Sequence, residues 1–318
     1  MSKLTIPAGY KMPLTNNELQ RAIELIHADF QHNLTVRLNL HRVSAPLFVD
    51  GATGLNDDLN GVERPVTFDI PDVGTDGQVV HSLAKWKRLA LKRYEFKLGT
   101  GLYTDMNAIR RDEVVDNLHS IYVDQWDWEK HIDPQNRNVL YLKDTVREIV
   151  GCICDTATAL RNAFPVLTFR PDRDVYFITT QELEDRFPNL TPNERELEIC
   201  RLHHTVFLMQ IGKTLKSGSK HDGRAPDYDD WDLNGDILMW NPVLGRNFEV
   251  SSMGIRVDAE ALDRQLEESG CNQRRNLPFH QMLLHGELPQ SIGGGIGQSR
   301  LCMLLLGTCH IGEVQVSL

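Results

Sequence analysis

The chain has 318 residues, of which 41% are hydrophobic and 25% are charged, a composition typical of a soluble globular protein. Its formal net charge of −10 argues against a general nucleic-acid-binding function. The first residues lack the apolar core of a signal peptide, and no stretch approaches the roughly 18 apolar residues of a membrane span. We therefore expect a cytoplasmic protein with no nucleic-acid or membrane partner, and we expect its six scattered cysteines to be reduced.

The first predicted helix begins at a capping box. Residues 1–14 are expected to form a loosely attached arm, and residues 15–318 a single domain. Thr15 and Glu18 have the spacing of a capping box. They open a helix whose apolar face is formed by Leu19, Ile23, Ile26 and Phe30. Alternating Val36, Leu38 and Leu40 then predict a strand, which Pro46 ends.

A loop and a basic helix follow. The loop at 51–61 contains Asp57 and Asp58, and exposed acidic loops are usually solvated. After a short strand at 79–81, Ser82 can cap a helix that runs to about residue 94. This helix carries the most basic cluster of the chain, namely Lys85, Lys87, Arg88, Lys92 and Arg93. We expect most of these side chains to lie on a solvated face.

The next two predicted strands lie at 101–106 and 120–129, joined by a loop that bears Arg110 and Arg111. In the second strand, the period of two places Gln125 and Asp127 on one face and the aromatic residues Tyr122, Trp126 and Trp128 on the other. A face that begins apolar and ends in Gln and Asp is typical of a strand that runs from a core into a pocket. The aromatic face is expected to be core packing.

The rest of the chain alternates strands and helices without regular βαβ units. A long amphipathic helix is predicted at 142–164, and a long polar loop at 213–233 is rich in aspartate around Arg224. Glu249 and Ser251 should share one face of their strand. The other elements are expected as strands at 175–179, 205–211, 236–240 and 248–255, and as helices at 181–187, 192–203, 259–269 and 279–284. This order favours an α+β fold with a mainly antiparallel sheet flanked by helices.

A glycine-rich stretch, GGGIGQSR at residues 293–300, precedes an apolar run. We interpret it as a loop that leads into a helix, where glycines let the backbone approach a ligand and the helix N-terminus attracts anions. Arg300 can add a permanently charged, planar group for phosphate or base stacking. The alternative is a loop that only turns the chain. It is neither a P-loop nor a clear Rossmann fingerprint.

Seven stretches together resemble one family. They are VHSLAKWK at 80–87, GLYT at 101–104, YVDQWDW at 122–128, RAPDYDDW at 224–231, NGDIL at 234–238, EVSSMGIR at 249–256 and the glycine-rich stretch. In this order they resemble the ammonia-dependent asparagine synthetases, from about residue 19 to residue 316. That family is similar in fold to the catalytic domain of class II aminoacyl-tRNA synthetases. The resemblance implies a homodimer formed through the first helix and the strand at Pro46.

The resemblance also implies a reaction and its residues. L-Aspartate, ATP and ammonia would give asparagine, AMP and pyrophosphate through a β-aspartyl adenylate. Arg110 and Arg300 would hold the nucleotide, with Lys87 as a third catalytic group. Asp236 and Glu249 would bind Mg²⁺. The further nucleotide-binding residues would be Ser120, Glu249, Gly293, Gly294 and Gly295. The substrate-binding residues would be Asp57, Lys87, Gln125, Asp127, Arg224, Asp229, Ser251 and Ser252.

Three alternatives stay open at this stage. An aspartyl- or asparaginyl-tRNA synthetase needs an anticodon-reading module, for which the sequence offers no spare segment. A non-catalytic paralogue should have lost some of Arg110, Glu249 and Arg300, and all three are present. A glutamine-fed synthetase needs an N-terminal cysteine nucleophile, whereas this chain begins Met-Ser. The chain also departs from the family by a short connection between Trp231 and Leu233 and by an early C-terminus.

Overall fold

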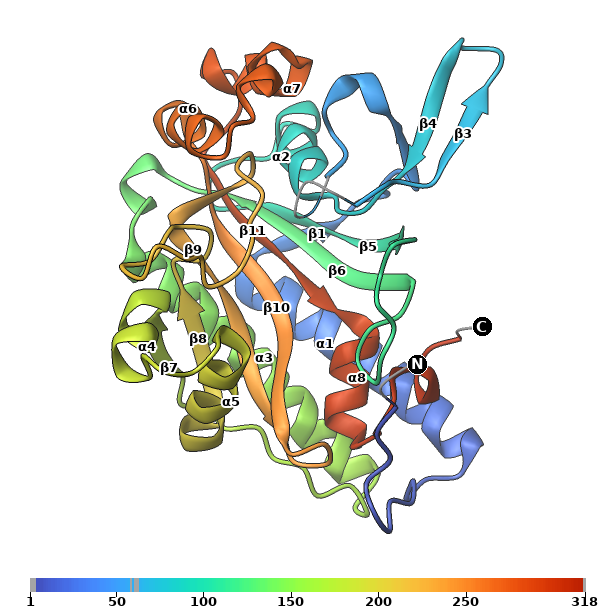
Figure 1. Ribbon diagram of the computed structural model, residues 1–318. Helices are drawn as coiled ribbons and strands as arrows, with labels where there is room; N and C mark the ends of the chain where they lie inside the picture. The colour runs from blue at the N-terminus through green and yellow to red at the C-terminus, as the bar shows by residue number, and fades with distance from the viewer. Residues whose placement is uncertain (1–3, 58, 60–62, 317–318) are drawn as a thin grey trace.

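An eight-stranded sheet forms the centre of the molecule (Figure 1). The computed structural model describes residues 4–57, 59 and 63–316. The strand order is β1-β5-β6-β11-β10-β9-β8-β7, and the two outer pairs are parallel while the inner pairs are antiparallel. A second sheet has the order β2-β4-β3. The expected α+β fold with a mainly antiparallel sheet is therefore confirmed.

The strands of the large sheet vary widely in length. They are β1 (Leu40–Arg42), β5 (Gly101–Ile109), β6 (Tyr122–His131), β7 (Tyr176–Thr179), β8 (Thr205–Met209), β9 (Asp229–Asn241), β10 (Arg246–Arg256) and β11 (Ser291–Gly297). The small sheet consists of β2 (Phe48–Asp50), β3 (Thr67–Ile70) and β4 (Thr75–Val79).

Helices cover both faces of the large sheet. They are α1 (Asn16–Leu38), α2 (Ala84–Arg93), α3 (Val139–Ala163), α4 (Thr180–Arg186), α5 (Pro192–His203), α6 (Ala259–Glu268), α7 (Pro278–Leu284) and α8 (Gln298–Leu306). Short 3-10 turns lie at Gly51–Thr53, Pro134–Asn136, Asn272–Asn276 and Ile311–Glu313. Within the described residues, no helix combines the length and the apolar character needed to cross a membrane.

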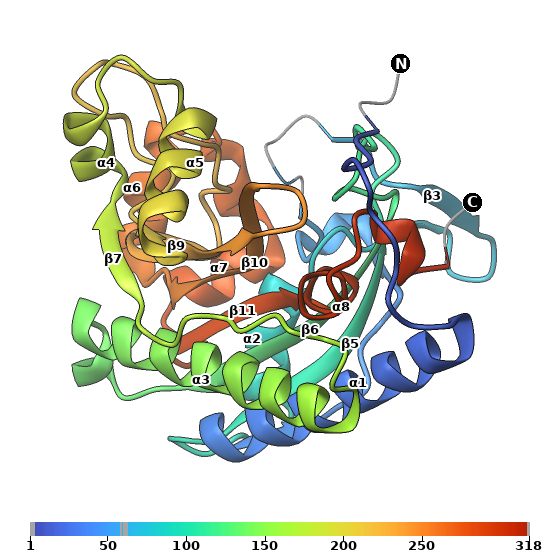
Figure 2. The ribbon, with the colours of Figure 1, turned by 90° about the horizontal axis from the view of Figure 1, so that it is seen from below.

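The main core lies between the sheet and the helices α1, α3 and α8. In Figure 2, α1 and α3 run side by side beneath the sheet. Trp126 and Trp128 of β6 are fully buried in this core, which confirms the predicted packing for these two residues, whereas Tyr122 on the same predicted face is exposed and lines the cavity described below. Their neighbours Gln125 and Asp127 consequently face the opposite side of the sheet, which α2 covers in part. This opposite face carries the cavity described below.

Helix α1 is longer than predicted. Its capping box is present, because Glu18 N donates to Thr15 Oγ1 and Thr15 N donates to Glu18 Oε2 at 2.9 Å. The strand predicted around Val36 is wrong: the helix continues to Leu38, and Val36 is exposed on it. Phe30, Leu34 and Leu38 repeat every four residues and are buried, so the helical period extends through this stretch.

Other boundaries also differ from the prediction, and two of them concern the centre of the large sheet. Strand β9 begins at Asp229, so the end of the predicted polar loop is part of the sheet. Residues 293–297, which were predicted to form a loop, are part of strand β11. Gly293 lies opposite Glu129 of β6 and Gly254 of β10, so this strand is central and hydrogen-bonded on both sides. The glycines of this stretch therefore belong to the central sheet, and its last three residues, 298–300, form the first turn of α8.

The N-terminal segment lies against the C-terminal part of the chain. Thr5 N donates to Asn117 Oδ1 at 2.8 Å, and Tyr10 Oη donates to Glu313 Oε2 at 2.7 Å. Leu14 is buried in the main core. From residue 5 onward, the predicted arm is thus attached by hydrogen bonds and by apolar packing.

Candidate active site

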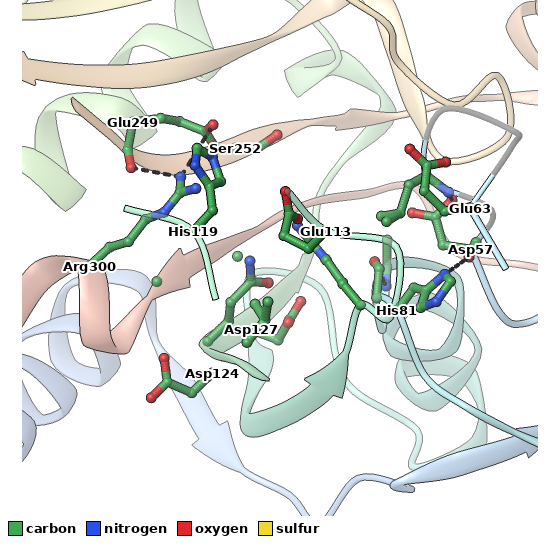
Figure 3. A pocket seen from close by; sticks show the side chains of 18 of the residues that line it. Asp57, Glu63, His81, Glu113, His119, Asp124, Asp127, Glu249, Ser252 and Arg300 are labelled. Carbon is green, nitrogen blue, oxygen red and sulfur yellow. Dashed lines mark hydrogen bonds and ion pairs between the residues drawn. The ribbon is translucent and has the colours of Figure 1, made fainter. Parts of the chain in front are cut away.

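A cavity of about 460 Å³ lies on the sheet face opposite α1 and α3. Strands β6, β9, β10 and β11 form its floor, and its walls include residues 110–114, 118–120 and 222–225. Figure 3 shows Glu249 and Arg300 at one end of the cavity, Asp57 and His81 at the other end, and Asp127 between them. The cavity is open and strongly charged, which suits a substrate with both cationic and anionic groups.

Lys87 and Asp127 form a buried ion pair in the cavity floor. Lys87 Nζ also donates to the carbonyl oxygen of Gly294 at 2.9 Å. Burial lowers the pKa of Lys87 from its usual value, although the nearby Asp127 carboxylate opposes the shift. Helix α2 carries the lysine and β6 carries the aspartate, so two packed elements fix the pair. A carboxylate and an ammonium group thus stand side by side at the cavity surface.

A second buried network lies beneath this pair and involves Arg256, at the end of β10. Its Nη2 lies 2.7 Å from Glu129 Oε2, and its Nη1 pairs with Asp229. Glu129 also accepts a hydrogen bond from Ser291 Oγ at 2.7 Å. Burial would raise the pKa of Glu129, but the charge and hydrogen bonds of Arg256, together with Lys87 and Ser291, outweigh burial and lower the pKa. Arg256 and Asp229 both line the cavity.

The other end of the cavity combines arginines with two carboxylates. Arg224 Nη2 lies 2.6 Å from Asp236 Oδ1, and its Nη1 hydrogen-bonds to Ser252 Oγ. Arg300 Nη1 donates to the carbonyl oxygen of Glu249 at 3.1 Å and lies 3.4 Å from Glu249 Oε2. Burial and the like charge of Glu249 raise the pKa of Asp236 to about 7, although Arg224 acts in the opposite direction.

A β-bulge decides which side chains of β10 face the cavity. The register with β9 shifts between Glu249 and Ser251, so that Ser252 pairs with Asp236 and Ser251 pairs with Ile237. Residues directly opposite each other share a face of the sheet. The prediction that Glu249 and Ser251 share a face is therefore wrong: Glu249 and Ser252 line the cavity, and Ser251 does not.

The glycines of β11 are required by close packing. A Cβ built on Gly293 would lie 2.0 Å from Glu129 Oε2, and one built on Gly295 would lie 2.4 Å from Gln125 Oε1. Glycine therefore lets charged and polar side chains of β6 lie flat over the strand. Gly295 lines the cavity, whereas Gly293 lies outside its lining, above the Glu129–Arg256 pair.

Most of the predicted site residues meet in this one cavity. Those that line it are Asp57, Lys87, Arg110, Ser120, Gln125, Asp127, Arg224, Asp229, Asp236, Glu249, Ser252, Gly294, Gly295 and Arg300. Ser251 and Gly293 are the two that do not. Asp58 lies outside the described residues. The fold brings together residues from seven separate stretches of the chain. The order of these stretches in the sequence does not reveal that they meet in one cavity.

The basic helix α2 differs most from its prediction. Lys85, Lys87 and Arg88 are buried, whereas Lys92 and Arg93 are exposed and Lys92 forms a surface ion pair. Lys85 Nζ lies 3.3 Å from Asp227 Oδ2, and Arg88 donates to the carbonyl oxygens of Pro289 and Val257. The solvated face predicted for this helix is thus wrong at three of five positions. Buried carboxylates and carbonyl groups, invisible in a local pattern, provide the partners.

Several cavity residues escaped the sequence analysis. Arg256 and Tyr228 lie within stretches that were singled out, but no role was predicted for them. Side chains alternate between the two faces of a strand, and Ser252 and Arg256 are four residues apart. The alternation could therefore have placed Arg256 on the same face of β10 as Ser252. Ile311 and Gln315, close to the C-terminus, also line the cavity, and nothing in their local sequence signals this position.

Comparisons with known proteins agree with this geometry. Residues 17–318 match the family described as aspartate-ammonia ligase. The chain is 58% identical over 317 residues to an aspartate–ammonia ligase of Lactobacillus johnsonii, covering 99% of this chain and 94% of the relative. It is 57% identical over 321 residues to an aspartate–ammonia ligase of Clostridium perfringens, covering 100% of this chain and 95% of the relative.

Solved structures share the fold at low sequence identity. An asparaginyl-tRNA synthetase of Pyrococcus horikoshii, complexed with asparaginyl-adenylate, matches with a TM-score of 0.71 at 14% identity, over 94% of this chain and 68% of that chain. An aspartyl-tRNA synthetase of Entamoeba histolytica matches with a TM-score of 0.63 at 15% identity, over 97% and 63%. These similarities confirm the predicted resemblance to class II aminoacyl-tRNA synthetases at the level of the fold.

Proposed function

The chain belongs to the aspartate–ammonia ligase family, and we propose that its cavity converts L-aspartate and ammonia to L-asparagine through a β-aspartyl adenylate, with release of AMP and pyrophosphate. The observation that carries this proposal is the arrangement of charged side chains along one cavity. Asp57 lies at one end and Arg300 at the other, with Asp127 between them. Lys87 pairs with Asp127, and Arg224 pairs with Asp236. An amino acid fits the first end and a nucleoside triphosphate the second.

The two chemical steps balance without a further reactant. In the first step, an oxygen of the β-carboxylate of aspartate attacks the α-phosphorus of ATP, and the bond to pyrophosphate breaks. In the second, the nitrogen of ammonia attacks the β-carbonyl carbon, the bond to AMP breaks, and a proton is lost. Both steps depend mainly on positioning and on neutralisation of negative charge.

Arg110 stands where the two substrates must meet. It follows directly after β5 and lines the cavity, and its charge acts on both Asp57 and Glu249. These two carboxylates mark the opposite ends of the cavity in Figure 3. A cation between them suits the α-phosphate, which must lie next to the attacking carboxylate. Lys87 and Gln125 are suited to the carboxylates of aspartate, and Asp57 and Asp127 to its α-ammonium group.

Asp236 and Glu249 fit a Mg²⁺ ion held together with the nucleotide. They lie on adjacent strands and face the same cavity, and burial together with the like charge of Glu249 raises the pKa of Asp236. A divalent cation relieves this repulsion. Within the described residues, no group of three or more His, Cys, Asp or Glu side chains could bind a metal alone, so phosphate oxygens would complete the coordination. When bound, Mg²⁺ neutralises charge on the phosphates.

Product analysis tests the proposed function. Purified protein incubated with aspartate, ATP, Mg²⁺ and ammonium chloride should form asparagine, AMP and pyrophosphate in equal amounts, as measured by mass spectrometry. Reactions that lack aspartate or ammonium serve as controls. Formation of ADP would contradict the adenylate route, and transfer of the amino acid to tRNA would support the synthetase alternative.

We also propose that the protein is a homodimer. The support is the α1–β1 unit at the edge of the sheet, together with an open groove formed by α1 and the end of α3, in which the half-buried Leu25 and Phe164 lie beside charged residues of α1. Sedimentation velocity at micromolar concentration should give the mass of two chains, because twofold pairing of the same surface is the commonest way in which identical chains assemble. A single species with the mass of one chain would contradict the proposal.

A further inference from the structure

Asn117 joins three stretches of the chain that are far apart in the sequence. It is only 4% exposed, does not line the cavity, and lies in the irregular loop that connects β5 to β6. Its Nδ2 donates to the carbonyl oxygens of Thr5 at 2.7 Å and of Cys309 at 2.6 Å, and its Oδ1 accepts from Thr5 N at 2.8 Å. Its own carbonyl oxygen accepts from Ile311 N at 2.9 Å. The loop, the N-terminal segment and the C-terminal turn therefore meet at one buried residue.

Further hydrogen bonds tie the N-terminal segment to the C-terminal turn. Tyr10 Oη donates to Glu313 Oε2 at 2.7 Å, and Glu313 Oε1 accepts from the backbone nitrogens of Cys309 and His310, both at 2.9 Å. The Glu313 carboxylate thus joins Tyr10 to the turn that Asn117 also holds. Residues 5–10 and 309–315 form, together with Asn117, a hydrogen-bonded group that we call the terminal unit.

The terminal unit borders the end of the cavity that is suited to the nucleotide. Its Gln315 donates through Nε2 to Ser299 Oγ at 3.1 Å, next to Arg300 in α8. Residues of the unit and of the attached loop line the cavity, namely Leu118, His119, Ser120, Ile311 and Gln315. Figure 3 shows His119 near Glu249 and Arg300. The unit therefore holds two chain segments that together form part of the cavity wall.

We propose that Asn117 is a positioning residue for nucleotide binding, which fastens the N-terminal segment and the C-terminal turn to the loop after β5 and so assembles the wall against which ATP binds. This inference rests on the proposed function, in which ATP occupies that end of the cavity. Irregular segments open at low free energy unless tertiary contacts hold them. A ligand that needs the assembled wall loses apparent affinity in proportion to the fraction of molecules in which the wall is displaced.

Two variants of Thr5 provide a matched test, because Thr5 contacts Asn117 through main-chain atoms and its own side chain is exposed. Thr5→Pro removes the N–H group that donates to Asn117 Oδ1, whereas Thr5→Ala keeps it. Calorimetric titration with α,β-methylene-ATP and Mg²⁺ should show about tenfold weaker binding in Thr5→Pro, since a buried acceptor loses its partner. Thr5→Ala should bind this analogue as the wild type does, and both variants should bind aspartate normally.

Asn117→Leu tests the same contact from its other side. The new side chain is uncharged and of similar size, and it removes all three side-chain hydrogen bonds, so the analogue should bind more weakly than to Thr5→Pro. The double variant should bind no more weakly than Asn117→Leu alone, because both changes break one contact. Effects that multiply would show that Thr5 acts independently of Asn117 and would overturn the inference. If Asn117→Leu does not fold, the two Thr5 variants still decide.

The two affinities identify which idea fails. A merely structural role of Asn117 would lower the melting temperature and weaken the binding of aspartate and of the ATP analogue alike. That outcome, or wild-type affinity for the analogue in Thr5→Pro, would overturn the inference and leave the proposed function intact. A wild-type protein that binds no ATP analogue would instead contradict the proposed function, and with it the role of Asn117.

Discussion

The variant Arg300→Ala should lose at least two orders of magnitude in aspartate-dependent pyrophosphate exchange while its fold stays intact. Arg300 lies in the first turn of α8, at the cavity wall, and its guanidinium group contacts both the backbone oxygen and the carboxylate of Glu249. Removing a cation that meets charge in the transition state costs on the order of 3 kcal/mol. We expect the same loss for Arg110→Ala, since Arg110 lies between the two ends of the cavity.

Suitable controls keep the charge or remove it elsewhere. Arg300→Lys retains a cation without the planar group and should recover only part of the activity. Arg201→Ala removes an exposed arginine of α5 that pairs with Glu198 at 2.6 Å and does not line the cavity. This variant should exchange pyrophosphate at the wild-type rate. Exchange within a few-fold of wild type in Arg300→Ala and Arg110→Ala, with unchanged melting temperatures, would contradict both roles.

The variant Lys87→Ala should nearly abolish aspartate binding and leave ATP binding close to normal. Lys87 is the buried partner of Asp127 and donates to Gly294, so its loss leaves a buried carboxylate without its cation at the aspartate end. Breaking such a pair typically costs about 3–5 kcal/mol, and we expect a lower melting temperature as well. Calorimetric titration of aspartate and of an ATP analogue measures the two affinities separately.

Lys92→Ala is the matched control for this experiment. It lies on the same helix, is paired at the surface with Glu287, and should bind aspartate as the wild type does. The double variant Lys87→Met with Asp127→Asn removes both charges, so it should recover stability without recovering aspartate affinity. If Lys87→Ala and Lys92→Ala bound aspartate equally well, Lys87 would not face the substrate.

Local sequence patterns predicted the presence of helices better than the residues at which the helices end. The capping box at Thr15 and the regular apolar spacing of α3 correspond to real helices, because these signals depend on neighbours a few residues away. Val36 misled the prediction, since one exposed apolar residue between Leu34 and Leu38 imitates the alternation of a strand. The continuing spacing of Phe30, Leu34 and Leu38 was the stronger signal.

The glycine-rich stretch shows why composition alone fails at a site. Consecutive glycines usually indicate a turn, but here Gly293 and Gly295 allow Glu129 and Gln125 of the neighbouring strand to lie across β11. The requirement comes from side chains more than 160 positions away in the sequence. A central glycine strand therefore cannot be distinguished from a loop until its partner strand is known.

The burial of Lys85 had no signal in its own helix. Lys85 and Lys87 lie two residues apart and point to different partners, Asp227 and Asp127, which belong to a distant loop and a distant strand. The sequence predicted that the two lysines would diverge, and it selected Lys87 correctly as a cavity residue. It treated Lys85 as solvated because a local pattern does not reveal which lysines meet a buried carboxylate.

The most direct test of the central claim follows oxygen atoms through the reaction. Aspartate labelled with ¹⁸O in its β-carboxylate is incubated with ATP, Mg²⁺ and ammonium, and the products are analysed by mass spectrometry. Attack of the carboxylate on the α-phosphorus should transfer one labelled oxygen to AMP and leave the other in the amide of asparagine. Pyrophosphate should carry no label. Unlabelled AMP, or label in inorganic phosphate together with ADP, would contradict a β-aspartyl adenylate.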